Sequence, residues 1–353
     1  MYSFAVKVNG AADPGIASGA SYIEVHERMG EPTAFRIRFH ADIAEQDIPI
    51  LSDPRFDPGS EIQVFAIIDQ AAHCLVRGPV CGQQASLAHG GAGSYVDVVG
   101  GDASITMNRK IRSHGWIGRD SDAVRAIVGD YPGVAADIQD TPASHEEVGH
   151  TLNQFDTDLR FIQRLARRNG FVFWLDADAQ GKLTAHFKRL ALDGAPVAKL
   201  TLNLDPPMIK QLELAWDVER PTSAQGMQVR LSDKTDLDGA VPRSPLPALA
   251  ALALADIVRD VRDTHVAPPA DDAGDLRARG EGALIDAGWF ITARGEAQQE
   301  AVGAILRSCT VIDLQGVGKR HSGKWLVAGV RHTLDASTHR MEFELLRNAW
   351  SRT

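Results

Sequence analysis

Cysteine is scarce in this sequence, and the number of cysteines is odd. The 353 residues include only three, Cys74, Cys81 and Cys309. Small disulfide-held domains carry several paired cysteines in a short chain, so the sequence does not belong to that class. The spacing of the first two is not that of a zinc knuckle either. We therefore expect the three thiols to pack as small, buried apolar side chains.

Long apolar segments are missing as well. The longest apolar run covers residues 248–255 and ends at Asp256, and a run of this length cannot cross a bilayer. Residues 1–15 show no basic start followed by an apolar core, so the sequence predicts no signal peptide. We expect synthesis and assembly in the cytoplasm, without membrane insertion.

Positive charge is in deficit. The chain has 37 Lys and Arg against 46 Asp and Glu, which leaves a formal net charge of −9. Non-specific binding of nucleic acid needs concentrated positive charge, and so does docking on anionic lipid, so neither is predicted. What remains is an ordinary globular composition, with 44% hydrophobic and 24% charged residues. A chain of this length is expected to fold as two or three units.

Both ends of the chain show the alternation that is typical of strands. Near the N-terminus, Phe35, Ile37 and Phe39 alternate with polar residues, and near the C-terminus Met341 and Phe343 do the same. A period of two places the apolar side chains on one face of a strand. Turn-forming Pro, Gly and Asp separate the runs. Many short strands divided in this way predict a barrel or a sandwich.

The two strand-rich ends also share an order of elements. Three predicted strands divided by turns recur in each, first at 62–68, 74–80 and 94–99 and then at 309–314, 324–333 and 339–346. An internal repeat of two similar β units is one interpretation. Chance similarity between strand-rich segments is the other.

Helical periodicity takes over in the middle of the chain. The clearest helix is predicted over 156–169, because apolar residues form one stripe, acidic residues begin it and arginines end it. Asn169-Gly170 stops this helix, and a hairpin is expected over 171–187. The other predicted elements are helices at 121–128, from Pro247 to about 262 and at 275–287, with an exposed linker at 266–274. The predicted fold class is therefore α+β and β-rich, with an α/β insertion between two β units.

We find no catalytic or metal-binding motif in the sequence. His145 and His150 resemble a zincin pair, but they are five residues apart, whereas HExxH places both imidazoles on one face of a helix. The glycine-rich loop after His89 lacks the strand–Ser–helix elbow of a hydrolase. We therefore predict no catalytic, metal-ligating or cofactor-binding residues and no enzymatic activity.

The C-terminal region resembles a known family. Residues 309–327 read CTVIDLQGVGKRHSGKWLV, followed by VRHT at 330–333 and EFELLRN at 342–348. This pattern resembles the late control protein D family of phages, which includes baseplate hubs of contractile tails, the hub part of VgrG spikes in type VI secretion and hubs of extracellular contractile injection systems. The segments 156–170 and 288–297 are similar to the middle helix and to a later strand of that family.

The resemblance implies a fold with two β-barrel-like tube domains per chain and α/β insertion domains between them. In that family three chains form a ring, which matches a hexameric inner tube on one side and a trimeric spike on the other. No OB-fold or β-helical needle follows Asn348, so the spike is expected to be a separate protein. The expected domains are a first tube domain at 1–105, an α/β insertion at 106–200, strands with a Pro-rich linker and helices at 201–288, and a second tube domain at 289–353.

The resemblance therefore implies a structural baseplate hub of a phage tail or tail-like particle. We expect a homotrimer without a cofactor that binds an inner tube protein, a spike protein and other baseplate proteins. The strand residues predicted at the interface are Phe35, Ile37, Phe39, Trp325, Met341 and Phe343. Two other classes remain as alternatives, an envelope-acting hydrolase that would use the His145 and His150 pair, and a β-rich binding module.

Overall fold

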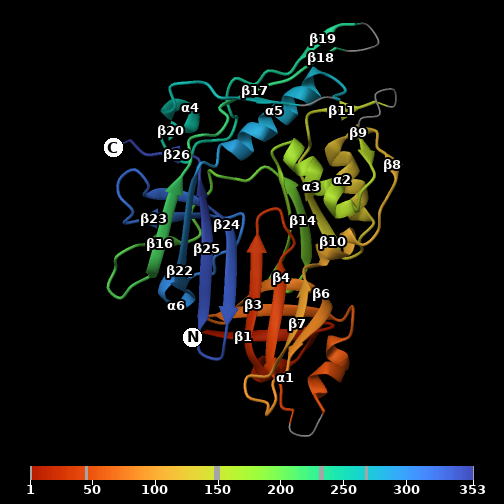
Figure 1. Cartoon of the computed structure of the whole chain (residues 1–353), viewed down its shortest axis with the longest axis vertical. Helices are drawn as coiled ribbons and strands as arrows, with labels where there is room; N and C mark the ends of the chain where they lie inside the picture. The colour runs from red at the N-terminus through yellow and green to blue at the C-terminus, as the bar shows by residue number, and fades with distance from the viewer. Residues whose placement is uncertain (1, 44–46, 147–151, 230–233, 267–268, 353) are drawn as a thin grey trace.

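The structure is a computed structural model that describes the chain except for residues 1, 44–46, 147–151, 230–233, 267–268 and 353. It is rich in strands, as the sequence predicts, and helices cluster in its middle part (Figure 1). The largest element is a 13-stranded sheet to which both ends of the chain contribute. No described helix is long and apolar enough to cross a membrane.

The first β unit comes from the N-terminal part of the chain. Its alternating apolar residues, among them Phe35, Ile37 and Phe39, point to one side and form a core with Ile23 and Val64. The two-residue period therefore predicted both the strand and its buried face. The elements are β1 (Tyr2–Val8), β2 (Ala11–Ala12), α1 (Pro14–Gly19), β3 (Ala20–Arg28), β4 (Ala34–His40), η1 (Pro49–Ser52), η2 (Pro54–Phe56), β5 (Glu61–Ile68), β6 (Ala71–Ser86), β7 (Tyr95–Gly101) and η3 (Ala103–Asn108).

The middle of the chain forms an α/β layer, seen at the right of Figure 1. Its two helices, α2 (Asp120–Gly129) and α3 (Asp158–Arg168), confirm the helices predicted there, and the hairpin of β13 (Val172–Ala177) and β14 (Leu183–Lys188) follows directly. Leu159, Ile162 and Leu165 form the buried stripe of α3. The remaining elements are β8 (His114–Gly115), β9 (Gly118–Arg119), β10 (Val134–Ile138), β11 (Ser144–His145) and β12 (Asn153–Gln154).

The second β unit and its covering elements come from the rest of the chain. Trp325, Met341 and Phe343 lie in its core. The elements are β15 (Lys199–Thr201), β16 (Ile209–Trp216), β17 (Ser223–Gln225), β18 (Met227–Val229), β19 (Asp236–Asp238), β20 (Leu252–Ala253), α4 (Leu254–Ile257), β21 (Asp263–His265), α5 (Ala273–Ala287), β22 (Ile291–Gln298), α6 (Gln299–Val302), β23 (Val311–Gln315), β24 (Gly323–Leu334), β25 (His339–Arg347) and β26 (Ala349–Trp350).

Two expectations about local structure are wrong. The helix predicted from Pro247 to about 262 is reduced to α4, because β20 pairs with β26 and Asn348 binds the backbone of Pro247 and Leu249. These long-range hydrogen bonds pair the backbone N–H and C=O groups that would otherwise be paired within a helix. Cys81 is exposed rather than buried, and Cys309 is half-buried, whereas Cys74 is buried as expected.

The main sheet also departs from the expected tube domains. Two separate barrel-like domains were expected, but among the described residues the sheet stays open and runs from one unit into the other through β24 and β3 (Figure 1). Strand β16 was expected outside the second tube domain, yet it pairs with β22 of that unit. The shared sheet therefore ties the two units together.

Candidate assembly interface

The two β units repeat one strand order. The first runs β3-β4-β7-β6-β5-β1 and the second runs β16-β22-β25-β24-β23-β15. The strands that the sequence predicted to recur, β5-β6-β7 and β23-β24-β25, occupy the same places in the two orders. One pair differs in direction, since β1 lies antiparallel to β5 whereas β15 lies parallel to β23. An internal repeat therefore explains the similar strand patterns.

Two irregularities of the first unit recur in the second. The β3–β4 ladder shifts register after Ala20, and the β16–β22 ladder shifts after Ile209. The β6–β7 ladder shifts between Val80 and Gly82, and the β24–β25 ladder shifts between Val327 and Gly329. Bulges bend a strand and increase its twist. Because both bulges recur at matching places, each strand of one unit can be assigned to its counterpart in the other.

The two units meet edge to edge. Strand β24 pairs antiparallel with β3, from Gly329 opposite Arg28 to Leu334 opposite Ile23. The later half of β24 thus has β25 on one side and the first strand of the other unit on its second side. The two units of the chain are therefore joined by antiparallel strand pairing.

A buried carboxylate lies at the junction. Glu27 of β3 is 2% exposed and forms an ion pair with Arg307, which lies just before β23. Burial alone would raise the pKa of Glu27, but Arg307, His332 and the backbone amide of Ser308 outweigh it and hold the pKa at about 2. The charged form of Glu27 therefore stabilises the contact between the units.

A histidine pair lies beside this carboxylate. His332 Nδ1 is 2.9 Å from His339 Nε2, and both rings are buried. Burial, followed by the nearby His332, lowers the pKa of His339 to about 3. His339 is therefore neutral near pH 7 and can share one proton with its neighbour.

All six residues predicted at the interface are buried in the hydrophobic cores of the two units. Phe35, Ile37 and Phe39 belong to the core of the first unit, and Trp325, Met341 and Phe343 belong to the core of the second. None is more than 7% exposed. Their side chains can therefore shape an interface through the strands that carry them, and their membership in an assembly interface stays a prediction.

His145, the first histidine of the zincin-like pattern, lies between two carboxylates. His145 is buried, with Nε2 2.9 Å from Asp120 Oδ1 and Nδ1 2.5 Å from Asp271 Oδ2. Burial would lower the pKa of His145, but Asp120 raises it above its usual range. Arg168 and Asp275 close the cluster, which links α2, α3 and α5. His150 lies outside the described residues, and no metal-binding group of His, Cys, Asp and Glu occurs among those described.

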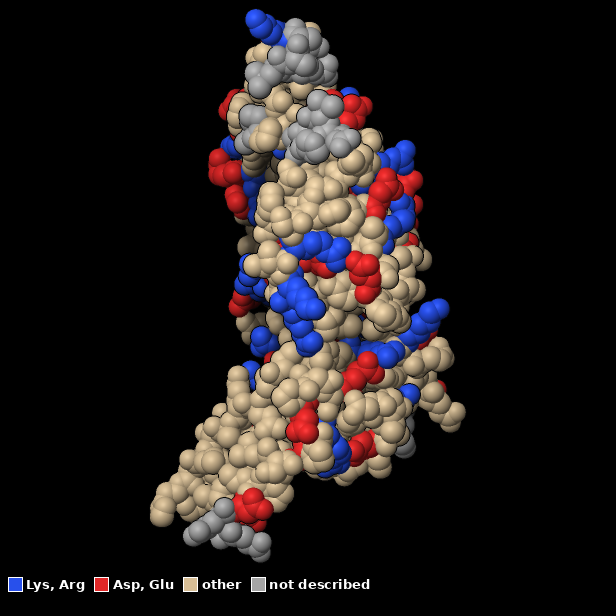
Figure 2. All heavy atoms as spheres, turned by 90° about the vertical axis from the view of Figure 1, so that its right-hand side faces the viewer, with Lys and Arg blue, Asp and Glu red and all other residues tan. Residues whose placement is uncertain are grey.

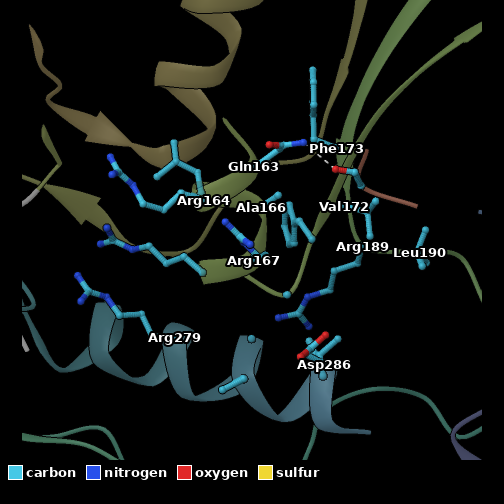
Figure 3. Close-up of a pocket in the computed structure, with 18 of the residues that line it drawn as sticks. Gln163, Arg164, Ala166, Arg167, Val172, Phe173, Arg189, Leu190, Arg279 and Asp286 are labelled. Carbon is cyan, nitrogen blue, oxygen red and sulfur yellow. Dashed lines mark hydrogen bonds between the residues drawn. The ribbon is translucent and has the colours of Figure 1, made fainter. Parts of the chain in front are cut away.

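A cavity of about 1120 Å³ lies between α3 and α5. Figure 3 shows arginine side chains from both helices around it. Four of the lining arginines are held by carboxylates: Arg164 by Asp156, Arg168 and Arg279 by Asp275, and Arg189, which follows β14, by Glu281.

The described lining of this cavity contains the exposed His265 but no serine or cysteine. Among the described lining residues, no hydroxyl or thiol nucleophile therefore stands beside a base.

Both the sequence and the fold have similarities to known proteins. Residues 1–202 match the family model described as the Alg8 N-terminal domain. A search of curated proteins finds no match. The fold is similar to a tail protein from Neisseria meningitidis over 98% of this chain and 97% of the other, with a TM-score of 0.67 and 14% identity.

Two further solved structures share the fold. The 43 kDa tail protein of prophage MuSo2 from Shewanella oneidensis is similar over 99% of both chains, with a TM-score of 0.66 and 14% identity. A type VI secretion component from E. coli, itself similar to the T4 tail proteins gp27 and gp5, is covered over 76% of its length and 97% of this chain, with a TM-score of 0.54 and 13% identity. At these identities the comparison shows a shared fold.

Proposed function

This chain belongs to the family of the Alg8 N-terminal domain, and from its fold we propose that it is a structural, non-enzymatic subunit of a phage tail or tail-like particle. The repeated β unit, with its edge-to-edge junction, carries the proposal. A protein whose two halves join by sheet continuation has surfaces suited to building larger rings from further copies. Full-length similarity to phage tail proteins supports the same role.

More specifically, we propose a baseplate hub of the late control protein D and VgrG-like type. Three chains would form a homotrimeric ring in which the two β units of each chain supply six similar segments. A hexameric inner tube protein would bind one side, and a separate trimeric spike protein would bind the other. The open sheet fits this proposal, because closure into a tube would come from neighbouring copies.

The domain division at 1–105, 106–200, 201–288 and 289–353 remains part of the proposal. The two outer segments, with β15 and β16 added to the second, would form the tube, and the rest of the middle segments would contact other baseplate proteins. The cavity between α3 and α5 offers such a contact on the outside of the proposed ring.

Deletion of the gene in the producing strain tests the role. We expect no assembled baseplates in particle preparations viewed by electron microscopy, and restoration when the wild-type gene is supplied on a plasmid. Normal particles from the deletion strain would overturn the proposal. In complemented strains, an affinity tag on the chain should isolate a complex with three-fold symmetry, whose mass includes three times the 38.1 kDa of one chain.

A further inference from the structure

Several strand edges of the main sheet have no strand beside them among the described residues, and β16 and β6 carry two of these edges. Strand β16 pairs with β22 on one side only. Strand β6 pairs with β5 up to Pro79, and its later part, Gly82–Ser86, pairs with β7 on one side only. Figure 1 shows β16 at the left end of the row of strands and β6 toward the right. An unpaired edge presents free backbone donors and acceptors to another strand.

These two edges are counterparts of the edges already joined inside the chain. In the repeat, β16 takes the place of β3, and β6 takes the place of β24. The later half of β24 pairs with β3 to join the units. The later half of β6 and the outer edge of β16 are thus the same pair of surfaces, left unpaired because six strands stand between them in the sheet of one chain.

The repeat also gives the register of such a pairing. In the second unit, Leu212 of β16 faces Gly295, which faces Phe343, which faces Val330 of β24. In the first unit, Ile23 of β3 faces Ile37, which faces Val98, which faces Gln83 of β6. Matching Leu212 with Ile23 therefore makes Val330 and Gln83 counterparts. Transferring the β24–β3 register to the free edges places Gln83 opposite Trp216, Gln84 opposite Ala215, Ala85 opposite Leu214 and Ser86 opposite Glu213.

Side chains on the free edge of β16 are more exposed than their counterparts in the filled junction. Glu27 is 2% exposed in the filled junction, whereas its counterpart Trp216 is 52% exposed. Val25 is fully buried, whereas its counterpart Leu214 is only half-buried. A strand of a second copy laid on β16 would remove this apolar surface from water, which is favourable by roughly 25 cal/mol per Å².

The charges of the two edges are compatible. Residues 78–96 contain no Lys, Arg, Asp or Glu. The lobe at the lower left of Figure 2 is likewise mostly free of charged residues. In the filled junction Arg331 lies 3.8 Å from Glu24. Their counterparts, Gln84 and Glu213, would replace the ion pair by a hydrogen bond from the Gln84 amide to the Glu213 carboxylate.

We infer that copies of this chain join head to tail through antiparallel pairing of Gly82–Ser86 in one copy with β16 of the next, in the register given above. The inference rests on the proposed function, because it specifies the contact that closes the ring. The contact uses two different surfaces, so it is heterologous and closes only when the rotation per copy completes a circle.

Engineered disulfides test this register in assembled particles. Ser86→Cys with Glu213→Cys, in a Cys81→Ser background, should give crosslinked species of two and three chains on non-reducing gels. Facing residues of an antiparallel pair have Cβ atoms roughly 4.5–5.5 Å apart, near the separation that a disulfide spans. A crosslink within one chain is excluded, since six strands stand between β16 and β6 in the sheet order.

The matched control is Ser86→Cys with Ala215→Cys, which keeps exposed positions on one face but lies two residues out of register. It should give at least ten-fold less crosslink than the in-register pair. A three-chain complex of native mass in which the in-register pair does not crosslink above this control would overturn the inference and leave the proposed function intact. A chain that associates with no second copy, in particles or in solution, would overturn both.

Discussion

Glu27 of the first β unit and Arg307 of the second form a buried ion pair across the junction of the two units. Arg307 also donates hydrogen bonds to the backbone carbonyls of Cys74 and Leu75, 2.9 and 3.4 Å away. One guanidinium therefore holds two strands of the first unit, β3 and β6, against the segment that precedes β23. The β24–β3 junction beside this ion pair is the internal template for the assembly contact inferred above.

Loss of Arg307 should destabilise the chain strongly. Arg307→Ala leaves the Glu27 carboxylate buried without its cation, which costs about 3–5 kcal/mol in comparable buried pairs. Chemical denaturation, followed by circular dichroism, measures this loss. Arg331→Ala is the matched control, because Arg331 is 45% exposed and its pair with Glu24 is expected to contribute less than about 1 kcal/mol. Equal effects of the two variants would contradict the assignment.

The junction should also respond to pH. The pKa of His339 is lowered to about 3 from an ordinary value of 6.5, so the unfolded chain binds a proton more readily than the folded one. The stability contributed by neutral His339 is therefore fully present above pH 6.5 and is lost as the pH falls toward 3. Unfolding curves at pH 7, 6 and 5 should show this loss in the wild type and a smaller slope in His339→Gln.

The same experiment separates His339 from Glu27. The pKa of Glu27 is lowered to about 2 from an ordinary value of 4.5. Its contribution is fully present above pH 4.5 and declines only as the pH falls from there toward 2. Glu27→Gln should therefore leave the slope between pH 7 and 5 unchanged. If Glu27→Gln reduced the slope of stability against pH between pH 7 and 5, the assignment of that slope to His339 would be wrong.

Helix packing in the middle layer depends on a glycine of α5. A Cβ added at Gly282 would lie 2.6 Å from the carbonyl oxygen of Arg167 and 2.7 Å from that of Arg168. Gly282→Ala should therefore push α5 from α3 and cost about 1–3 kcal/mol. Gly129→Ala in α2 is the control, since nothing lies within 4 Å of its added Cβ, and it should be neutral or stabilising by up to about 1 kcal/mol. Thermal unfolding compares the two.

A charge at the free edge should alter association without altering the fold. Gln84→Glu would place a carboxylate beside Glu213 of the next copy, and like charges across a strand pair are destabilising by about 0.2–1 kcal/mol. We expect weaker association in sedimentation velocity, with an unchanged unfolding midpoint. Adding Glu213→Lys should restore association. Failure of this second substitution to rescue the first would place Gln84 outside the contact.

The sequence by itself determined much of the local structure. Its two-residue period placed Phe35, Ile37 and Phe39 on a strand with a buried face, and the acidic start and basic end of 156–169 predicted α3 within two residues at each end. These features follow from interactions between near neighbours, so they can be read along the chain. The recurring strand order was visible for the same reason.

Only the tertiary structure decided how the repeated units are used. Residues 247–253 begin a predicted helix, but pairing of β20 with β26 and hydrogen bonds with the Asn348 side chain replace that part of it. The exposed β16 edge was not recognised, because a strand's place in a sheet depends on partners far away in the chain. Its Leu212 and Leu214 alternate with polar residues as in any half-buried strand. Whether such a strand ends a sheet is set by long-range backbone pairing, which local periodicity does not record.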